Sequence, residues 1–119
     1  MNTDTVTFRQ VALDYFKCWN NKDLAGLKRI ISEDARLIDW EIDVTGLVNV
    51  LEANQQIFRD LPTIRAEIVS VTVEPKIVIA ELNIFISASE VLEVVDILKF
   101  TDNYQIKSIK AFKCRELRT

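Results

Sequence analysis

Residues 15–35, YFKCWNNKDLAGLKRIISEDA, contain the pattern that decides the fold: a helix, a break, a second helix and the start of a strand. Apolar residues that recur every three or four positions predict the first helix, with one stripe made of Phe8, Val11, Ala12, Tyr15 and Trp19. Residues 20–22 break this helix, and Asp23 suits the N-cap of the second. At Asp34 the periodicity changes, which predicts a short strand over residues 36–40.

The remaining sequence predicts a third helix followed by four long strands. Thr45 is a candidate cap for that helix, and Pro62 ends it. Its apolar side carries Leu47, Val50, Leu51, Asn54, Phe58 and Leu61. The strands are predicted at residues 65–74, 76–88, 91–101 and 105–114, with short turn-like segments between them. Short turns favour antiparallel pairing, and helices followed by strands are typical of an α+β domain.

The composition favours one ordinary globular domain over residues 1–119. Hydrophobic residues make up 49% of the chain and charged residues 28%. The net charge of −3 argues against a nucleic-acid partner, which needs a concentrated basic face. No apolar run approaches the roughly 20 residues that span a bilayer, and the first residues do not resemble a secretory signal. We therefore expect a cytoplasmic protein without a membrane partner.

Missing residue types restrict the chemistry. The chain contains no histidine, so a Ser-His or Cys-His nucleophile pair and an imidazole metal ligand are excluded. Two glycines are too few for a phosphate-binding loop or a dinucleotide fingerprint. The acidic pairs Glu33-Asp34 and Glu41/Asp43 lack the repeating pattern of a calcium loop. We expect no metal and no cofactor, and any catalysis must use carboxylates, phenols or lysines.

Two cysteines, Cys18 and Cys114, lie far apart in the sequence and have no partners at metal-ligand spacing. They could form a disulfide only if the fold brought them together. We expect free, buried thiols instead, as in most cytosolic proteins.

Asp96 stands on an apolar strand face, in the alternating series Leu92, Val94, Asp96, Leu98 and Phe100. An isolated ionised carboxylate would be costly at such a position. Asp96 must therefore be paired, hydrogen-bonded or kept protonated by a raised pKa. A structural aspartate, or one turned to solvent by a β-bulge, is the alternative interpretation.

Other polar or aromatic residues also have two interpretations. Tyr15 and Asn54 lie on the apolar stripes of their helices, where each could be an ordinary core residue or part of a pocket. Asp39 is predicted on the short strand and could equally be an exposed strand-end carboxylate. Trp19 and Trp40 could form a flat wall for an aromatic or alicyclic ligand, or pack in the core or an interface.

The second long strand is apolar on both faces. One face carries Val78, Ala80, Leu82, Ile84 and Ile86, and the other carries Ile77, Ile79 and Phe85. One face can cover the helices. The other needs a different partner, and a homodimer formed through the sheet is the simplest expectation.

Several of these segments resemble the superfamily that includes nuclear transport factor 2, the SnoaL-like polyketide cyclases and the steroid Δ-isomerases. The resemblance lies in residues 15–24 and 31–35 and in the last two strands, at residues 96–100 and 106–112. It implies a cone-shaped roll, in which three N-terminal helices pack on the concave face of a strongly curved, mostly antiparallel, mixed sheet. Because this fold hosts many activities, the resemblance is informative for fold more than for function.

The steroid isomerases have three key groups with counterparts in this chain. Their oxyanion tyrosine corresponds to Tyr15, their general base to Asp39, and their protonated oxyanion aspartate to Asp96. The resemblance implies proton abstraction α to a carbonyl in a small apolar ligand. We expect ligand contacts from Trp19, Asn54, Phe58 and Phe100. The alternatives are a non-catalytic ligand-binding module and a dimeric interaction domain whose pocket its own side chains fill.

Overall fold

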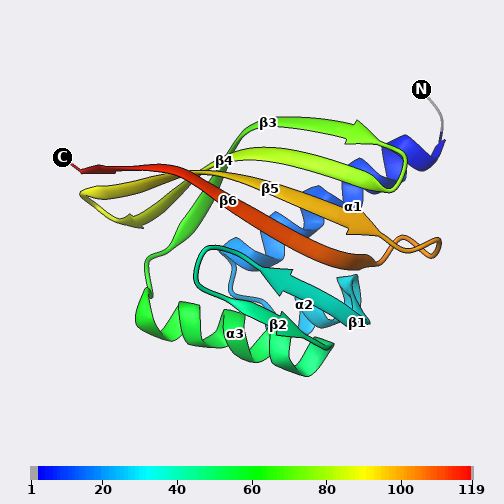
Figure 1. The fold of residues 1–119 in the computed structure, drawn as a ribbon, viewed down its shortest axis with the longest axis horizontal. Helices are drawn as coiled ribbons and strands as arrows, with labels where there is room; N and C mark the ends of the chain where they lie inside the picture. Colours follow the sequence, from blue (N-terminus) through cyan, green and yellow to red (C-terminus); the bar gives the residue numbers. More distant parts are fainter. Residues whose placement is uncertain (1–2, 119) are drawn as a thin grey trace.

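All six strands form one sheet, in the order β2-β1-β6-β5-β4-β3 (Figure 1). The computed structural model describes residues 3–118. The helices are α1 (Thr3–Asn20), α2 (Leu24–Ile30) and α3 (Leu47–Asp60). The strands are β1 (Ile31–Ile38), β2 (Asp43–Thr45), β3 (Arg65–Glu74), β4 (Ile77–Ser87), β5 (Glu90–Phe100) and β6 (Ile106–Arg118).

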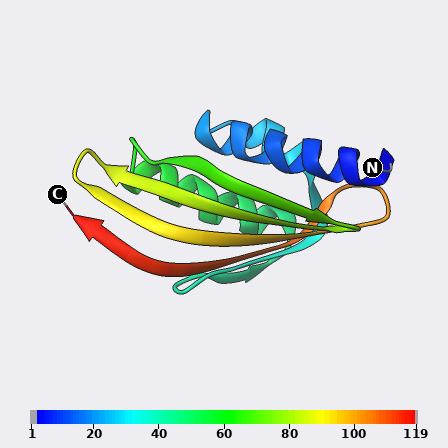
Figure 2. The ribbon, with the colours of Figure 1, turned by 90° about the horizontal axis from the view of Figure 1, so that it is seen from above.

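The sheet is mixed, open and curved. The pair β1–β6 is parallel, and each other neighbouring pair is antiparallel. Figure 2 shows the long strands β3–β6 bending together, with α1 lying along the concave side. This is the predicted α+β roll with three helices packed on a curved mixed sheet. The four long strands also start and end within a few residues of their predicted bounds, with β6 four residues longer at its C-terminal end.

The predicted apolar stripe of α1 packs on the sheet. Its members Phe8, Ala12 and Tyr15 are buried, and Val11 and Trp19 are half-buried. Phe16, outside the predicted stripe, is buried as well. At the end of the helix, the Asn20 side chain accepts a hydrogen bond from the Ala66 N–H at 2.7 Å and donates to the Ala66 carbonyl at 2.9 Å. These two bonds join the C-terminal end of α1 to β3. They therefore hold the last two turns of α1, which carry Tyr15 and Trp19, in a defined position over the sheet.

The break after α1 behaves as the sequence predicts. The Asp23 side chain accepts a hydrogen bond from the Gly26 N–H at 2.9 Å, which caps α2. The alternation of β4 is also confirmed. Val78, Ala80 and Leu82 are buried under the helices, whereas Ile79 on the opposite face is exposed.

The region between β1 and α3 differs from the prediction. The first strand ends at Ile38, so Asp39 lies in the following turn and not on the strand. Thr45 pairs with Arg36 as the last residue of β2, a short strand that the prediction lacked. Thr45 therefore does not cap α3. The N-cap is Gly46, whose φ of 96° suits glycine, and no side-chain hydrogen bond caps this helix.

Both cysteines are free, as expected, but their burial differs from the expectation. Cys18 is half-buried and Cys114 is exposed. Cys114 lies at the register shift of the β5–β6 pairing, between Lys113 and Arg115, where it has no partner residue on β5. No helix within residues 3–118 is long and apolar enough to cross a membrane.

Candidate functional site

A cavity of about 300 Å³ opens between the concave side of the sheet and helices α1 and α3. Its wall is mostly aliphatic and aromatic, and residues from α1, α3, the β1–β2 turn and five strands contribute to it. The residues in its wall are Tyr15, Phe16, Trp19, Leu37, Asp39, Trp40, Glu41, Ile42, Asn54, Ile57, Leu61, Ile64, Ala66, Leu82, Ile84, Ile86, Glu90, Leu92, Val94, Asp96, Ile109, Ala111, Lys113 and Glu116. A space of this size and character suits a small, largely apolar molecule.

The cavity brings together five of the seven predicted site residues: Tyr15, Trp19, Asp39, Asn54 and Asp96. The other two, Phe58 and Phe100, do not line it. Phe58 supports the wall from behind, with its ring centroid 5.5 Å from that of Trp19. Phe100 is fully buried beside Phe8, at the opposite end of β5 from the cavity mouth. Both phenylalanines therefore belong to the core.

Asp96 lies in the middle of β5, and its carboxyl group has space above it. Its register partners on the two neighbouring strands are Ala80 and Ala111, whose small side chains leave room on that face of the sheet. The residue is 8% exposed. Burial, together with the negative charge of Asp39, raises the pKa of Asp96 to about 7. Near neutral pH, a large share of the molecules therefore carry a protonated Asp96 that can donate a hydrogen bond.

Tyr15 approaches the same space from α1 and is 4% exposed. Burial and the negative charge of Asp96 raise the pKa of Tyr15 above its usual value, so the phenol stays neutral. Neither Tyr15 nor Asp96 forms a side-chain hydrogen bond with residues 3–118. Every fully buried side-chain nitrogen or oxygen in that range has a partner. The unpartnered oxygens of these two residues must therefore be accessible, and the cavity is the space that both side chains line.

Asp39 reaches the cavity from the turn that follows β1. Its Oδ1 accepts hydrogen bonds from the N–H groups of Glu41 and Ile42, both at 2.7 Å. Its own N–H donates to the Ile42 carbonyl at 2.8 Å. These bonds fix the turn, and with it the position of the carboxylate at the edge of the cavity. Oδ2 accepts no hydrogen bond from the described part of the chain and is free to act on a ligand.

The Asn54 side chain orients Trp19 and uses most of its hydrogen-bonding capacity within the protein. The Trp19 Nε1–H donates to the Asn54 Oδ1 at 3.0 Å, and the Asn54 Nδ2 donates to the Val50 carbonyl at 3.0 Å. Because Asn54 is only 2% exposed, both bonds are protected from competing water. The pair explains why a polar residue occupies the apolar stripe of α3: it holds the indole ring as a fixed wall of the cavity.

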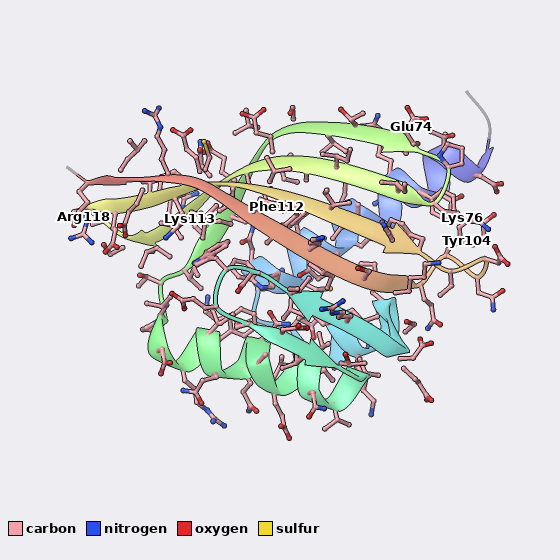
Figure 3. All side chains as sticks on the ribbon, viewed as in Figure 1. Glu74, Lys76, Tyr104, Phe112, Lys113 and Arg118 are labelled. Atoms are coloured by element: carbon pink, nitrogen blue, oxygen red, sulfur yellow. The ribbon has the colours of Figure 1, made fainter. Side chains whose placement is uncertain are left out.

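The site residues predicted from the sequence did not include four charged residues at the cavity mouth: Glu41, Glu90, Lys113 and Glu116. Strict alternation would place Lys113 and Glu116 on opposite faces of β6. A register shift in the β5–β6 pairing aligns Val94 with Lys113 but Leu92 with Glu116, so both residues face the cavity. Figure 3 shows Lys113 and Arg118 on the C-terminal half of β6, at the end of the sheet away from Lys76 and Tyr104. This register shift has no signal in the periodicity of the sequence.

Across residues 3–118, no three carboxylate or thiol side chains lie together in a way that could hold a metal ion. The chemistry that the cavity itself offers is that of two buried hydrogen-bond donors, Tyr15 and protonated Asp96, and one nearby carboxylate, Asp39.

A helix-covered, curved, mixed sheet with an open cavity on its concave side defines the class of this protein as a cone-shaped α+β domain. The profile of the SnoaL-like domain matches residues 12–109, and the chain belongs to this family. A search of curated protein sequences found no match.

Solved structures with the same fold share little sequence with this chain. A candidate ketosteroid isomerase from Kribbella flavida is 21% identical, with 95% of this chain and 82% of that chain covered and a TM-score of 0.83. A candidate SnoaL-like polyketide cyclase from Jannaschia is 15% identical, with coverages of 96% and 90% and a TM-score of 0.84. A SnoaL-like protein of unknown function from Burkholderia thailandensis is 12% identical, with coverages of 92% and 96% and a TM-score of 0.82. At these identities the likeness establishes the fold alone.

Proposed function

We propose that this SnoaL-like domain binds a small, largely apolar carbonyl compound in the cavity and moves a proton from the carbon α to its carbonyl. The observation that carries the proposal is that Tyr15 and Asp96, two largely buried residues whose side-chain oxygens have no protein partner, line one apolar cavity that Asp39 also lines. Polar oxygens that are accessible from an apolar cavity and lack a protein partner are available to a ligand, which can complete their hydrogen bonding.

In the proposed reaction, Oδ2 of Asp39 removes the α proton, and the electron pair of the C–H bond moves to form an enolate. The Tyr15 hydroxyl and protonated Asp96 donate hydrogen bonds to the enolate oxygen. Protonated Asp39 then returns the proton to the same carbon or to a conjugated one. The scheme needs Asp39 ionised while Asp96 is protonated. The Asp39 charge favours this division because it raises the pKa of Asp96.

The test is deuterium exchange α to the carbonyl in a panel of apolar cyclic ketones and enones, followed by NMR. The wild-type protein should accelerate exchange for at least one compound. Asp39→Asn should abolish the acceleration, since its amide oxygen can still accept the turn hydrogen bonds but cannot take a proton. Glu33→Gln, an exposed residue outside the cavity, serves as the matched charge control. Exchange at the buffer rate across the panel, with the protein folded, would overturn the catalytic proposal.

One observation favours a second candidate, a non-catalytic ligand-binding module. Asp39 already has a structural role, because its Oδ1 holds the β1–β2 turn. The same panel separates the two functions when ligand binding is followed through the fluorescence of Trp19 and Trp40, which both line the cavity. Saturable binding without exchange, unchanged in Asp39→Asn, identifies the binding module. The absence of both binding and exchange would reject a ligand-directed function.

A further inference from the structure

The charges around the cavity have mostly one sign. Five carboxylic side chains line it, and one lysine opposes them. The acids are Asp39, Glu41, Glu90, Asp96 and Glu116, and the lysine is Lys113. The whole chain carries 18 acidic and 15 basic residues, so this ratio does not follow from composition. The acidic excess is a local property of the cavity wall.

The acids divide into an inner and an outer group. In the inner group, Asp96 is buried and Asp39 is half-buried, and both line the cavity with Tyr15. Glu41 and Glu116 are exposed and Glu90 is half-buried, so these three form the mouth, together with Trp40, which is 42% exposed. A ligand whose carbonyl oxygen accepts hydrogen bonds from Tyr15 and Asp96 would therefore place its other end among the outer acids.

The positive charges near the mouth do not neutralise it. Arg118 lies 3.7 Å from Glu90 and 3.4 Å from Glu116, so one guanidinium faces two carboxyl groups. Lys113 lies over the Trp40 ring, with 5.5 Å between its Nζ and the ring centroid. Glu41 forms no ion pair with the described residues and keeps its charge uncompensated.

Hydrogen bonding with the neighbouring Glu116 carboxyl group raises the pKa of Glu90, so these two carboxyl groups lie close together at the mouth. An ammonium group can bridge such a pair, because it donates hydrogen bonds to two carboxylates at once. Trp40 also lines the cavity, and the face of its ring that Lys113 leaves uncovered offers a second favourable contact for a cation. A carboxylate or phosphate at the same place would meet like charges and an indole face that does not favour anions.

We propose that the cavity selects ligands with an apolar body and a protonated amine at the end facing the mouth, and that it rejects carboxylate and phosphate compounds of the same size. This inference rests on the proposed ligand-binding function and adds the chemical class of the ligand. The unpartnered Tyr15 and Asp96 oxygens supply the independent reason to expect a ligand, and the acidic mouth supplies its charge.

The test compares three probes of equal chain length, hexylamine, hexan-1-ol and hexanoate, at neutral pH and low salt. Binding is measured by tryptophan fluorescence and by NMR line broadening of the probe. We expect hexylamine to bind roughly tenfold or more tightly than hexanoate, with hexan-1-ol between them, and we expect added salt to reduce the difference. Equal affinities, or tighter binding of hexanoate, would overturn the inference.

Substitutions at the mouth test whether its carboxylates cause the preference for the amine. The double variant Glu90→Gln/Glu116→Gln should lower the affinity for hexylamine towards that for hexan-1-ol and leave hexan-1-ol unchanged, which also shows that the variant is folded. The matched control, Glu33→Gln/Glu52→Gln, removes two exposed carboxylates outside the cavity and should change neither affinity. If none of the three probes binds, the ligand-binding proposal itself fails. If hexan-1-ol binds without any preference for the amine, only the charge inference fails.

Discussion

Replacing Asp96 by asparagine should make the protein more stable at neutral and alkaline pH but not in acid. Asp96 is 8% exposed, and its folded-state pKa of about 7 lies above the ordinary value of 3.8. Between these two values the folded chain binds a proton at Asp96 that the unfolded chain has released. Wild-type stability therefore falls as the pH rises from about 4 to about 7, because the buried group must lose its proton.

The size of the effect follows from the two pKa values. Each pH unit between them is worth about 1.4 kcal/mol, which gives up to about 4 kcal/mol once Asp96 is fully ionised in both states. Asparagine has nearly the same shape and does not ionise. The stability difference between Asp96→Asn and wild type should thus grow by up to about 4 kcal/mol from pH 4 to pH 8 and then level off.

The assay is urea unfolding of both proteins, followed by circular dichroism at half-unit pH intervals. Any constant offset reflects the different hydrogen bonding of an amide, and only the change with pH tests the reasoning. Glu52→Gln, which removes an exposed charge on α3, should give a curve parallel to that of wild type. If the difference between Asp96→Asn and wild type stays constant within about 0.5 kcal/mol, burial does not penalise the Asp96 carboxylate, and the donor role proposed for it is refuted.

Three further outcomes test the architecture. Asn20→Ala removes both hydrogen bonds to the Ala66 backbone. In urea titrations it should lower the free energy of unfolding by about 2 kcal/mol, and a loss below about 0.5 kcal/mol contradicts the anchoring role of Asn20. Gly26→Ala should cost about 1–3 kcal/mol in the same assay, since a Cβ there would lie 2.5 Å from the Asp23 Oδ2; a variant as stable as wild type contradicts this. We also propose a homodimer through the sheet face opposite the helices, where Phe112 is 49% exposed (Figure 3). Phe112→Lys should shift the sedimentation coefficient from dimer to monomer, and a wild-type chain that is monomeric at all concentrations contradicts the dimer.

Local patterns in the sequence determined the helices and long strands because each depends on residues near one another in the chain. The stripe from Phe8 to Trp19 predicted α1, and Asp23 predicted the cap of α2. The alternation around Asp96 predicted a strand with an acid on its buried side. Each of these features follows from a periodicity of 3.6 or 2 residues, or from the capping preference of one side chain.

Only the tertiary structure decided which of these residues meet around one cavity. It placed Tyr15, Asp39 and Asp96 together from three separate elements, and it assigned Phe58 and Phe100 to the core. The acidic mouth depends on a register shift between β5 and β6, and the place of Asp39 depends on a turn closed by its own carboxylate. Convergence and register are set by packing and pairing between segments far apart in the chain, whereas periodicity reports only the face on which a residue lies.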